Sequence, residues 1–270
     1  MKQNNYYIVK KIQPWFYTIH DPIGVFCYLI VGREKALLFD TAHGIAPLDD
    51  VIRSITALPY EVVLSHGHWD HTAGAYQFDT VWLHPADFEI CQRHFNSQTR
   101  QNIMNWYQDV ITTAAPDFNA ATYLTIDQKQ SPTLRALSAN QRFDLGGLTV
   151  VMVPMEGHTP GSVGAFIEEH GFLLVGDATN AHCWMFLEDS LTIRTYVEML
   201  KKLQQLPFKW FLMSHAEKQF PYADIQKYIT VAENIDIKKA TPYEYKFDSL
   251  GGYLYEEDGV GIVFNPRKLS

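Results

Sequence analysis

The chain has 270 residues, of which 47% are hydrophobic and 19% are charged, and its formal net charge is −8 at pH 7. The apolar share is large enough to form a core, which excludes an intrinsically disordered chain. The acidic balance argues against a nucleic-acid-binding protein, whose surface is normally basic, and it suits a protein that acts on a small molecule.

Cysteine usage and the lengths of the apolar runs bear on the cellular compartment. Cys27, Cys91 and Cys183 lie far apart and form neither a Cys-x-x-Cys pair nor a disulfide framework, which is typical of a reducing cytoplasm. No apolar run approaches the roughly 18 residues of a membrane span, and residues 1–15 hold no stretch of signal-peptide length. We therefore expect a cytoplasmic protein without membrane contact. A homo-oligomer is possible, but the sequence does not indicate one.

Apolar and β-branched runs predict a series of strands in the first third of the chain. These predicted strands cover residues 7–9, 15–19, 25–31, 36–39, 61–65 and 81–83. Residues 47–58 have the apolar spacing of a helix. Pro85 is expected to open another helix, with Phe88, Cys91 and Phe95 on one face.

Residues 96–117 are polar and aromatic and have no strand pattern, so we predict a helical insertion there. Its Trp106 and Tyr107 are candidates to cover a cleft. An ordinary packed helix explains the same pattern equally well, and the sequence leaves both interpretations open.

The second half repeats the alternation of strands and helices. Strands are predicted over residues 148–153, 163–167, 172–175 and 208–213, helices over 191–206 and 223–238, and β-like pieces over 243–264. No linker rich in Pro, Gly or Ser divides the chain. We therefore predict one domain of the α/β class over residues 1–270.

The densest functional pattern is Leu64-Ser-His-Gly-His-Trp-Asp-His71, which places three histidines and an aspartate within six residues. It follows the strand predicted over 61–65 and precedes a short helix expected from Thr72 onward. A loop that leaves a strand can direct side chains into a cleft. Imidazole and carboxylate are common ligands of zinc and iron. Four ligands on one turn cannot easily reach one tetrahedral ion, so the density suggests two neighbouring metals.

Three further candidate ligands follow predicted strands in the second half of the chain. His158 lies in a Gly- and Pro-containing turn after strand 148–153, Asp177 follows strand 172–175, and His215 follows strand 208–213. Each alone is as readily explained as a turn-forming or hydrogen-bonding residue. Together they provide the additional ligands that a two-metal site needs.

The chain resembles the metallo-β-lactamase fold superfamily and, more loosely, its glyoxalase II-like and lactonase-like branches. The resemblance covers nearly the whole chain and implies a four-layer αββα sandwich, in which two mixed sheets are flanked by helices. Where the family usually has glycine before the last histidine, this chain has Ser214. The motifs that carry the resemblance are Phe39-Asp40-Thr41, His66-Gly-His-Trp-Asp-His71, Gly157-His-Thr-Pro-Gly161, Gly176-Asp177 and Ser214-His215.

The resemblance also implies a role for each ligand. His66, His68 and His158 would hold one divalent metal, Asp70, His71 and His215 would hold a second, and Asp177 would bridge the two. Asp40 would fix the ligand loop through hydrogen bonds. Zinc is the expected metal, with iron or manganese as alternatives.

Two such metals imply a hydrolase. They would lower the pKa of a bridging water so that hydroxide attacks a carbonyl, with Asp70 as the catalytic residue that orients it. The expected substrate is a thioester, ester or lactone. The sequence has no basic cluster to hold a glutathione or coenzyme A tail, which argues against a strict glyoxalase II.

Two other functions stay open. A mononuclear iron enzyme similar to the persulfide dioxygenases would carry the same motifs, and metal analysis would separate it from a hydrolase. A non-enzymatic binding protein with this fold is disfavoured because all seven ligands are present.

Several residues near the motifs have no clear role in the sequence. We interpret His43, His182 and Cys183 as structural residues, although each is close to a predicted ligand. Residues 184–187, an apolar Trp-Met-Phe-Leu segment expected to lie in a loop, would either form an acyl-binding wall or pack under the helix predicted over residues 191–206.

Overall fold

The structure is a computed structural model that describes residues 6–126, 131–245 and 251–270. The chain divides into two units. The first runs to Ser138 and includes Arg142–Val150, and the second comprises Ala139–Gln141 and Val151–Ser270. Within the described ranges, no helix combines the length and the apolar character needed to cross a membrane.

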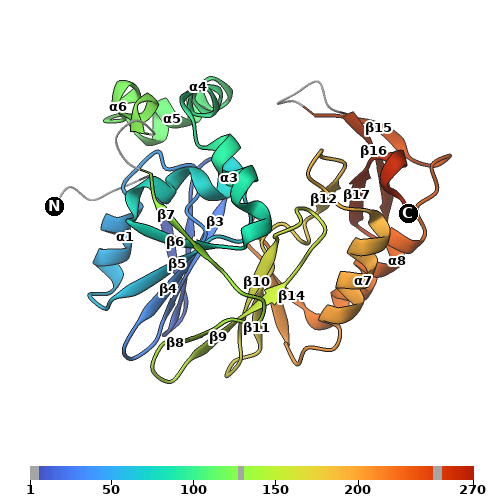
Figure 1. Ribbon diagram of the computed structural model, residues 1–270, viewed down its shortest axis with the longest axis horizontal. Helices are drawn as coiled ribbons and strands as arrows, with labels where there is room; N and C mark the ends of the chain where they lie inside the picture. Colours follow the sequence, from blue (N-terminus) through green and yellow to red (C-terminus); the bar gives the residue numbers. More distant parts are fainter. Residues whose placement is uncertain (1–5, 127–130, 246–250) are drawn as a thin grey trace. The chain divides into compact units, whose positions relative to one another are not determined.

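The first unit is built on a seven-stranded mixed sheet with the order β1-β2-β3-β4-β5-β6-β7 (Figure 1). Strands β1 to β4 pair antiparallel and β4 to β7 pair parallel. The carboxyl ends of β4 and β5 therefore share one edge, where side chains can converge on a ligand. The strands are β1 (Ile8–Gln13), β2 (Phe16–His20), β3 (Phe26–Val31), β4 (Ala36–Phe39), β5 (Tyr60–Val63), β6 (Thr80–Leu83) and β7 (Thr133–Ala136).

Short helices follow the strands of this sheet. They are α1 (Leu48–Ile55), α2 (Trp69–Thr72), η1 (Ala73–Gln77), η2 (Pro85–Asp87) and α3 (Phe88–His94). Helix α2 begins three residues before the helix expected from Thr72, so that prediction was wrong at its start. The reason is local, because the backbone N–H and the hydroxyl of Thr72 both donate to the carbonyl of His68 and close the turn earlier.

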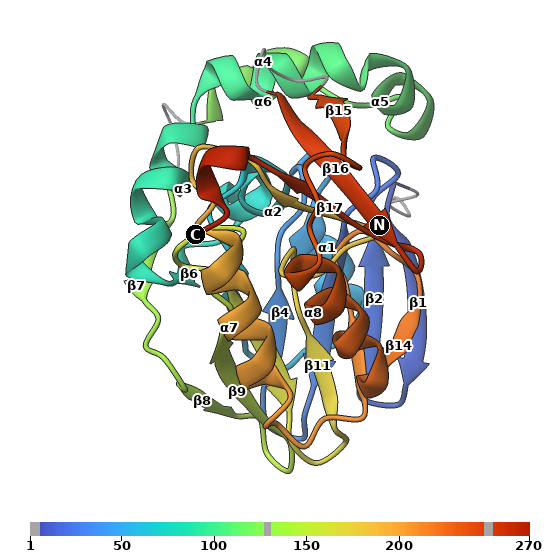
Figure 2. The same ribbon diagram turned by 90° about the vertical axis from the view of Figure 1, so that its right-hand side faces the viewer.

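Residues 96–117 hold helices and continue into a third one. Helices α4 (Ser97–Trp106), α5 (Gln108–Ala114) and α6 (Ala120–Leu124) lie together beyond one end of the seven-stranded sheet (Figures 1 and 2). Asn96 and Asn119 cap α4 and α6, since each side chain accepts a hydrogen bond from the backbone N–H three residues later.

Arg100 of α4 is one of the largest buried side chains of the protein, with 2% exposed. Its Nη1 donates to the carbonyl of Ala73, 3.3 Å away, at the end of α2. The rings of Tyr76, Phe95 and Tyr123 surround the guanidinium, with centroids 4.9–5.2 Å from it. Cation–π contacts offset part of the cost of burying the charge. Arg100 thus ties the insertion to the ligand-bearing helix.

A second sheet has six strands in the order β14-β13-β11-β10-β9-β8. Its strands are β8 (Arg142–Asp144), β9 (Thr149–Pro154), β10 (Val163–Ile167), β11 (Phe172–Leu174), β13 (Trp210–Leu212) and β14 (Gln219–Pro221). β11 pairs parallel with β13 and antiparallel with β10, so this sheet is mixed as well.

A third sheet has four strands in the order β12-β17-β16-β15. β-like pieces were predicted over residues 243–264, but strand β12 and a separate third sheet were not. The loop expected at residues 184–187 is wrong, because Trp184 and Met185 belong to β12, which pairs parallel with β17. Cys183 and Met185 point into the core of the second unit, and His182 and Trp184 alternate with them. The strands are β12 (His182–Met185), β15 (Thr241–Glu244), β16 (Gly251–Glu257) and β17 (Val260–Phe264).

Two helices pack side by side in the second unit, α7 (Ile193–Leu203) and α8 (Ile225–Glu233) (Figure 2). Their apolar faces share a core with strands of the second and third sheets. Helix α8 was predicted to reach residue 238 but ends at Glu233. Asp236 accepts a hydrogen bond from the backbone N–H of Lys238 and so stabilises a turn in place of the last helical turn. The α/β class with mixed sheets and flanking helices is confirmed.

Replacing Arg100 with Met should lower the free energy of unfolding by about 2–4 kcal/mol, because the variant loses a buried hydrogen bond and three ring contacts. Denaturant unfolding of the full chain measures this. Arg194→Met is the matched control. Its side chain is 76% exposed and contacts Glu198 at 3.2 Å, so the change should stay within about 0.5 kcal/mol. Equal stability of Arg100→Met and wild type would contradict a stabilising role for the buried cation.

Candidate metal centre

The first unit brings four of the predicted ligands together. His66 and His68 lie on the loop that follows β5, and Asp70 and His71 lie in α2. The ring of His66 is 4.8 Å from that of His68 and 4.2 Å from that of His71, measured between centroids. His71 Nε2 lies 3.5 Å from Asp70 Oδ2. The three histidine rings are buried. Residues that are close together in the motif therefore form a compact set of nitrogen and oxygen donors in the structure.

Asp40 holds this ligand set from the end of β4. Its carboxylate accepts hydrogen bonds from the backbone N–H of Ser65 at 2.7 Å, from the Ser65 hydroxyl at 2.9 Å and from His71 Nδ1 at 2.9 Å. The last contact leaves Nε2 as the His71 nitrogen that faces a metal. A carboxylate on the outer nitrogen of a ligating histidine is a common way to fix the ring and its tautomer.

The backbone of the ligand loop is also fixed. The N–H of Gly67 donates to Asp87 Oδ2 at 2.8 Å, and Asp87 is fully buried. A Cβ at Gly67 would come within 2.8 Å of Ile90 and 2.9 Å of the Asp87 carbonyl, so only glycine fits between the two histidines. On the other side, the Thr41 hydroxyl donates to the His71 carbonyl at 2.7 Å.

The second unit brings the other three predicted ligands together. In the parallel pair of β11 and β13, Leu174 lies opposite Leu212, so Asp177 and His215 each follow three residues beyond a paired position. His215 Nε2 is 3.3 Å from Asp177 Oδ1, and His158 Nε2 is 3.8 Å from Asp177 Oδ2. Asp177 thus lies between two histidines, which is the position expected of a shared ligand.

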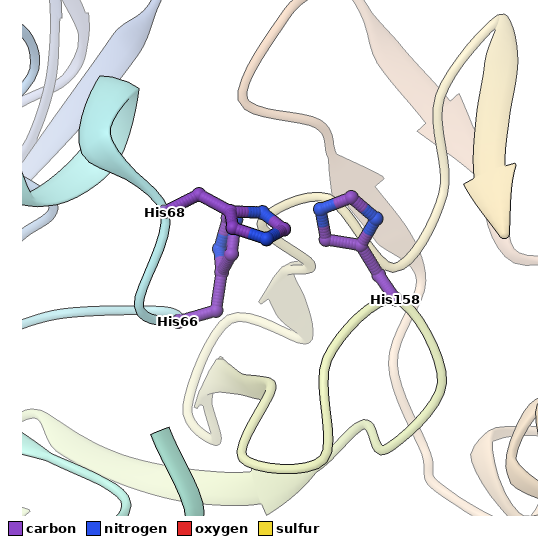
Figure 3. A group of neighbouring side chains, drawn as sticks. All are labelled: His66, His68 and His158. Atoms are coloured by element: carbon purple, nitrogen blue, oxygen red, sulfur yellow. The ribbon is translucent and has the colours of Figure 1, made fainter. Parts of the chain in front are cut away.

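His158 is held by the backbone and not by a carboxylate. Its Nδ1 lies 2.7 Å from the carbonyl oxygen of Trp184. The Ser190 hydroxyl donates to the backbone carbonyl of His158 at 3.0 Å. Figure 3 shows the side chains of His66 and His68 on the loop after β5, and that of His158 on the loop after β9. As in His71, the contact at Nδ1 orients the ring so that Nε2 can serve as the ligand atom.

The chemistry of the donors fits a first-row divalent metal. Each of the seven residues offers one ring nitrogen or one carboxylate oxygen. Nitrogen and oxygen donors of this kind suit zinc, iron and manganese. Three of the histidines, His66, His71 and His158, have a hydrogen-bond partner at Nδ1, as ligating histidines in metal sites commonly do.

Several known sequences are similar to this chain. The family model described as "Metallo-beta-lactamase superfamily" matches residues 20–86. The human protein named acyl-coenzyme A thioesterase MBLAC2 is 29% identical over 180 residues, which cover 62% of this chain and 61% of the human one. The probable metallo-hydrolase YqgX of Bacillus subtilis is 21% identical over 157 residues, which cover 58% of this chain and 66% of that one. The matching family model shows that residues 20–86 are similar to the metallo-β-lactamase superfamily.

Solved structures of superfamily members have the same fold. A metallo-β-lactamase from Pontibacter korlensis covers 85% of this chain and 100% of its own, with a TM-score of 0.62 and 15% sequence identity. A metallo-β-lactamase from Erythrobacter litoralis covers 86% of this chain and 99% of its own, with a TM-score of 0.60. At this identity the likeness is one of fold.

The first unit also has a buried acid–imidazole pair that the sequence did not reveal. His43 Nδ1 lies 2.5 Å from Asp21 Oδ2. Burial alone would raise the pKa of Asp21, but the His43 ring and two backbone N–H groups hold it below its usual value. The His43 ring contacts Trp69 and Tyr107, with centroids 5.4 and 5.6 Å away. Its Nε2 is buried and has no hydrogen-bond partner in the part of the chain that the structure describes.

Asp21 and Asp87 had no signal in the sequence, because a single carboxylate carries no spacing pattern. The histidines interpreted as structural have different surroundings. His43 is buried, whereas His182 is exposed and pairs with Glu256 at 3.0 Å. Cys183 is buried in the core of the second unit, as that interpretation expects.

Asp40→Asn should weaken zinc binding by about 10–100-fold, because the amide nitrogen cannot accept the hydrogen bonds of Ser65 or His71. Competition with a chromogenic chelator measures the affinity of the full chain. Asp49→Asn is the control, since Asp49 is a half-exposed carboxylate of α1 that contacts Arg53 and Tyr60, and its loss should leave the affinity unchanged. Unchanged affinity in Asp40→Asn would show that Asp40 does not orient the ligands.

The three thiols should be unreactive in the folded protein. All are buried, and burial raises the pKa of Cys91 and of Cys183 to about 11 and that of Cys27 well above its usual value. At pH 8 a thiol of pKa 11 is ionised in roughly one molecule in a thousand, and the thiolate is the reactive form. A thiol–disulfide reagent should therefore titrate no cysteine in the native protein and three after denaturation. Rapid labelling of Cys183 in the native state would contradict this.

Proposed function

We propose that this chain is a dinuclear metal-dependent hydrolase. In this proposal His66, His68 and His158 hold one ion, and Asp70, His71 and His215 hold a second. Asp177 is the ligand shared by both. The observation that carries the proposal is the pre-organised donor set, in which each unit arranges its own ligands through buried hydrogen bonds.

Bound divalent ions would supply Lewis acidity, which lowers the pKa of water toward about 7 and polarises a carbonyl oxygen. The protein's own residues would position the reactants. Asp70, 3.5 Å from His71 Nε2, can accept a hydrogen bond from the attacking water and so direct its oxygen at the carbonyl carbon. For a thioester, a carbon–oxygen bond forms and the carbon–sulfur bond breaks. The products are a carboxylic acid and a thiol.

Relatives support an acyl thioester as the substrate class. The human relative and a bovine one are named acyl-coenzyme A thioesterases, and the match covers 61% of each. A hydrolase name is also carried by the Bacillus subtilis relative. These names favour hydrolysis over the mononuclear dioxygenase chemistry, and zinc is the metal we propose.

Metal content tests the ligand assignment. The reloaded wild-type chain should contain close to two ions, Asp177→Ala should lose affinity at both positions, and His215→Ala should retain about one ion. His170→Ala, at a turn away from the ligand motifs, should still contain two. Elemental analysis of the dialysed proteins gives the counts. If the reloaded wild-type chain contains a single ion and His215→Ala still contains that ion, the mononuclear alternative is favoured.

Turnover tests the chemistry. The zinc-loaded chain should hydrolyse acyl thioesters, a strong chelator should abolish the activity, and added zinc should restore it. Release of free thiol measures the rate. Turnover that survives complete removal of metal would separate the reaction from the seven ligands and contradict the proposal.

A further inference from the structure

Four aromatic side chains gather on one face of the third sheet. We call Trp184, Phe186, Tyr243 and Tyr245 the aromatic patch. The Tyr245 ring lies 5.2 Å from that of Trp184 and 5.5 Å from that of Phe186, between centroids. The Tyr243 ring lies 5.7 Å from that of Phe186. Phe186 is buried, whereas the other three rings keep part of their surface exposed.

The backbone of the third sheet makes room for this patch. Trp184 lies on the face of β12 opposite Cys183 and Met185, which belong to the core of the second unit. Phe186 lies over strand β16 at Gly252, where a Cβ would come within 2.9 Å of the Phe186 side chain. The patch is therefore a separate cluster from the core on the other face of the sheet.

The patch is continuous with the metal ligands of the second unit. The carbonyl oxygen of Trp184 is the partner of His158 Nδ1 at 2.7 Å. The Ser190 hydroxyl donates both to that oxygen, at 3.4 Å, and to the His158 carbonyl, at 3.0 Å. Strand β12 also begins only five residues after Asp177. Trp184 thus orients the predicted ligand His158 with its backbone carbonyl and contributes its side chain to the patch.

The charges near the patch select an apolar occupant. Lys268 is the cation beside the loop that follows Phe186, and its Nζ donates to the carbonyls of Leu187, Glu188 and Ser190 at 2.6–2.8 Å. Its three protons are thus already used by the backbone. The whole chain is acidic, with a formal charge of −8. Because the backbone engages Lys268, this cation offers little to a phosphate-bearing head group, whereas a hydrocarbon chain would gain by leaving water for the ring faces.

We propose that the aromatic patch binds the acyl chain of the substrate and sets the preferred chain length. This inference rests on the proposed thioester hydrolysis. Each methylene group that moves from water onto the patch raises kcat/KM by up to about fourfold, until the chain outgrows the rings. Short acyl groups gain nothing from the patch, because they end before they reach it.

Chain-length profiles test the patch. We would measure kcat/KM of the zinc-loaded full chain with acetyl, hexanoyl and dodecanoyl thioesters of N-acetylcysteamine, which lack the coenzyme A tail. In wild type, kcat/KM should rise with chain length. Trp184→Ala and Tyr245→Ala should lower the ratio of dodecanoyl to acetyl kcat/KM at least tenfold, mainly through KM. Trp184→Phe should restore part of this ratio.

Tyr253→Ala is the matched control. Tyr253 belongs to β16 of the same sheet, is 38% exposed and packs against Phe264, outside the patch. Its chain-length profile should equal that of wild type. If wild type prefers long chains and Trp184→Ala and Tyr245→Ala keep the same ratio, the patch proposal is overturned while the hydrolase proposal stands.

Direct binding separates the two proposals when turnover is absent. S-Dodecyl-N-acetylcysteamine is a thioether that cannot be hydrolysed, and calorimetry gives its Kd for the zinc-loaded chain. Trp184→Ala should weaken this binding at least tenfold, and Tyr253→Ala should not change it. Equal Kd values for wild type and Trp184→Ala would overturn the patch proposal. Failure to hydrolyse any thioester, with binding as expected, would overturn only the hydrolase proposal.

Discussion

The ligand geometry of the first unit depends on one buried carboxylate, that of Asp40. Its φ of 68° lies in the left-handed region, which residues other than glycine rarely adopt and which Asp tolerates better than most. This turn directs the carboxylate toward Ser65 and His71, which donate three hydrogen bonds to it. Phe39 pairs with Val63 in the parallel strands β4 and β5, so a slip of one residue would separate Asp40 from Ser65. Strand register thus determines where the proposed metal ligands point.

In the second unit, the backbone positions the predicted ligands. Asp177, the proposed shared ligand, and His215, a proposed ligand that is exposed, each lie three residues past a paired residue of β11 and β13. His158 is oriented by a carbonyl oxygen of β12. The acceptor that orients the histidine is thus a backbone carbonyl in the second unit and a side-chain carboxylate in the first. The two halves of the proposed centre therefore depend on different forces, buried charge in the first unit and sheet geometry in the second.

The sequence predicted what is local and missed what depends on distant pairing. The ligand motif and most strands follow from short apolar runs, and His158, Asp177 and His215 each lie where a strand ends. Strand β12 was missed for two reasons. It pairs with β17, almost 80 residues later in the chain. Its residues are also mixed polar and apolar and continue into an apolar run, so they show no clear strand pattern. Strands β7, β8 and β14 are only three or four residues long and largely exposed, so they carry little apolar signal. Asp87, which holds the ligand loop, has no pattern at all.

The insertion is attached to the ligand loop by buried polar contacts, which bears on whether it can act as a lid. Arg100 donates to the carbonyl at the end of α2, and the Tyr123 hydroxyl donates to the carbonyl of His43 at 2.7 Å. Trp106 packs against Trp69, which lies between two predicted ligands. To open, the insertion would have to break these hydrogen bonds and expose the cation–π contacts of Arg100. A lid that moves in each catalytic cycle should have few such contacts. The contacts therefore favour a fixed brace, in which α4 and α6 hold α2 and the β4 loop in the geometry that Asp40 requires.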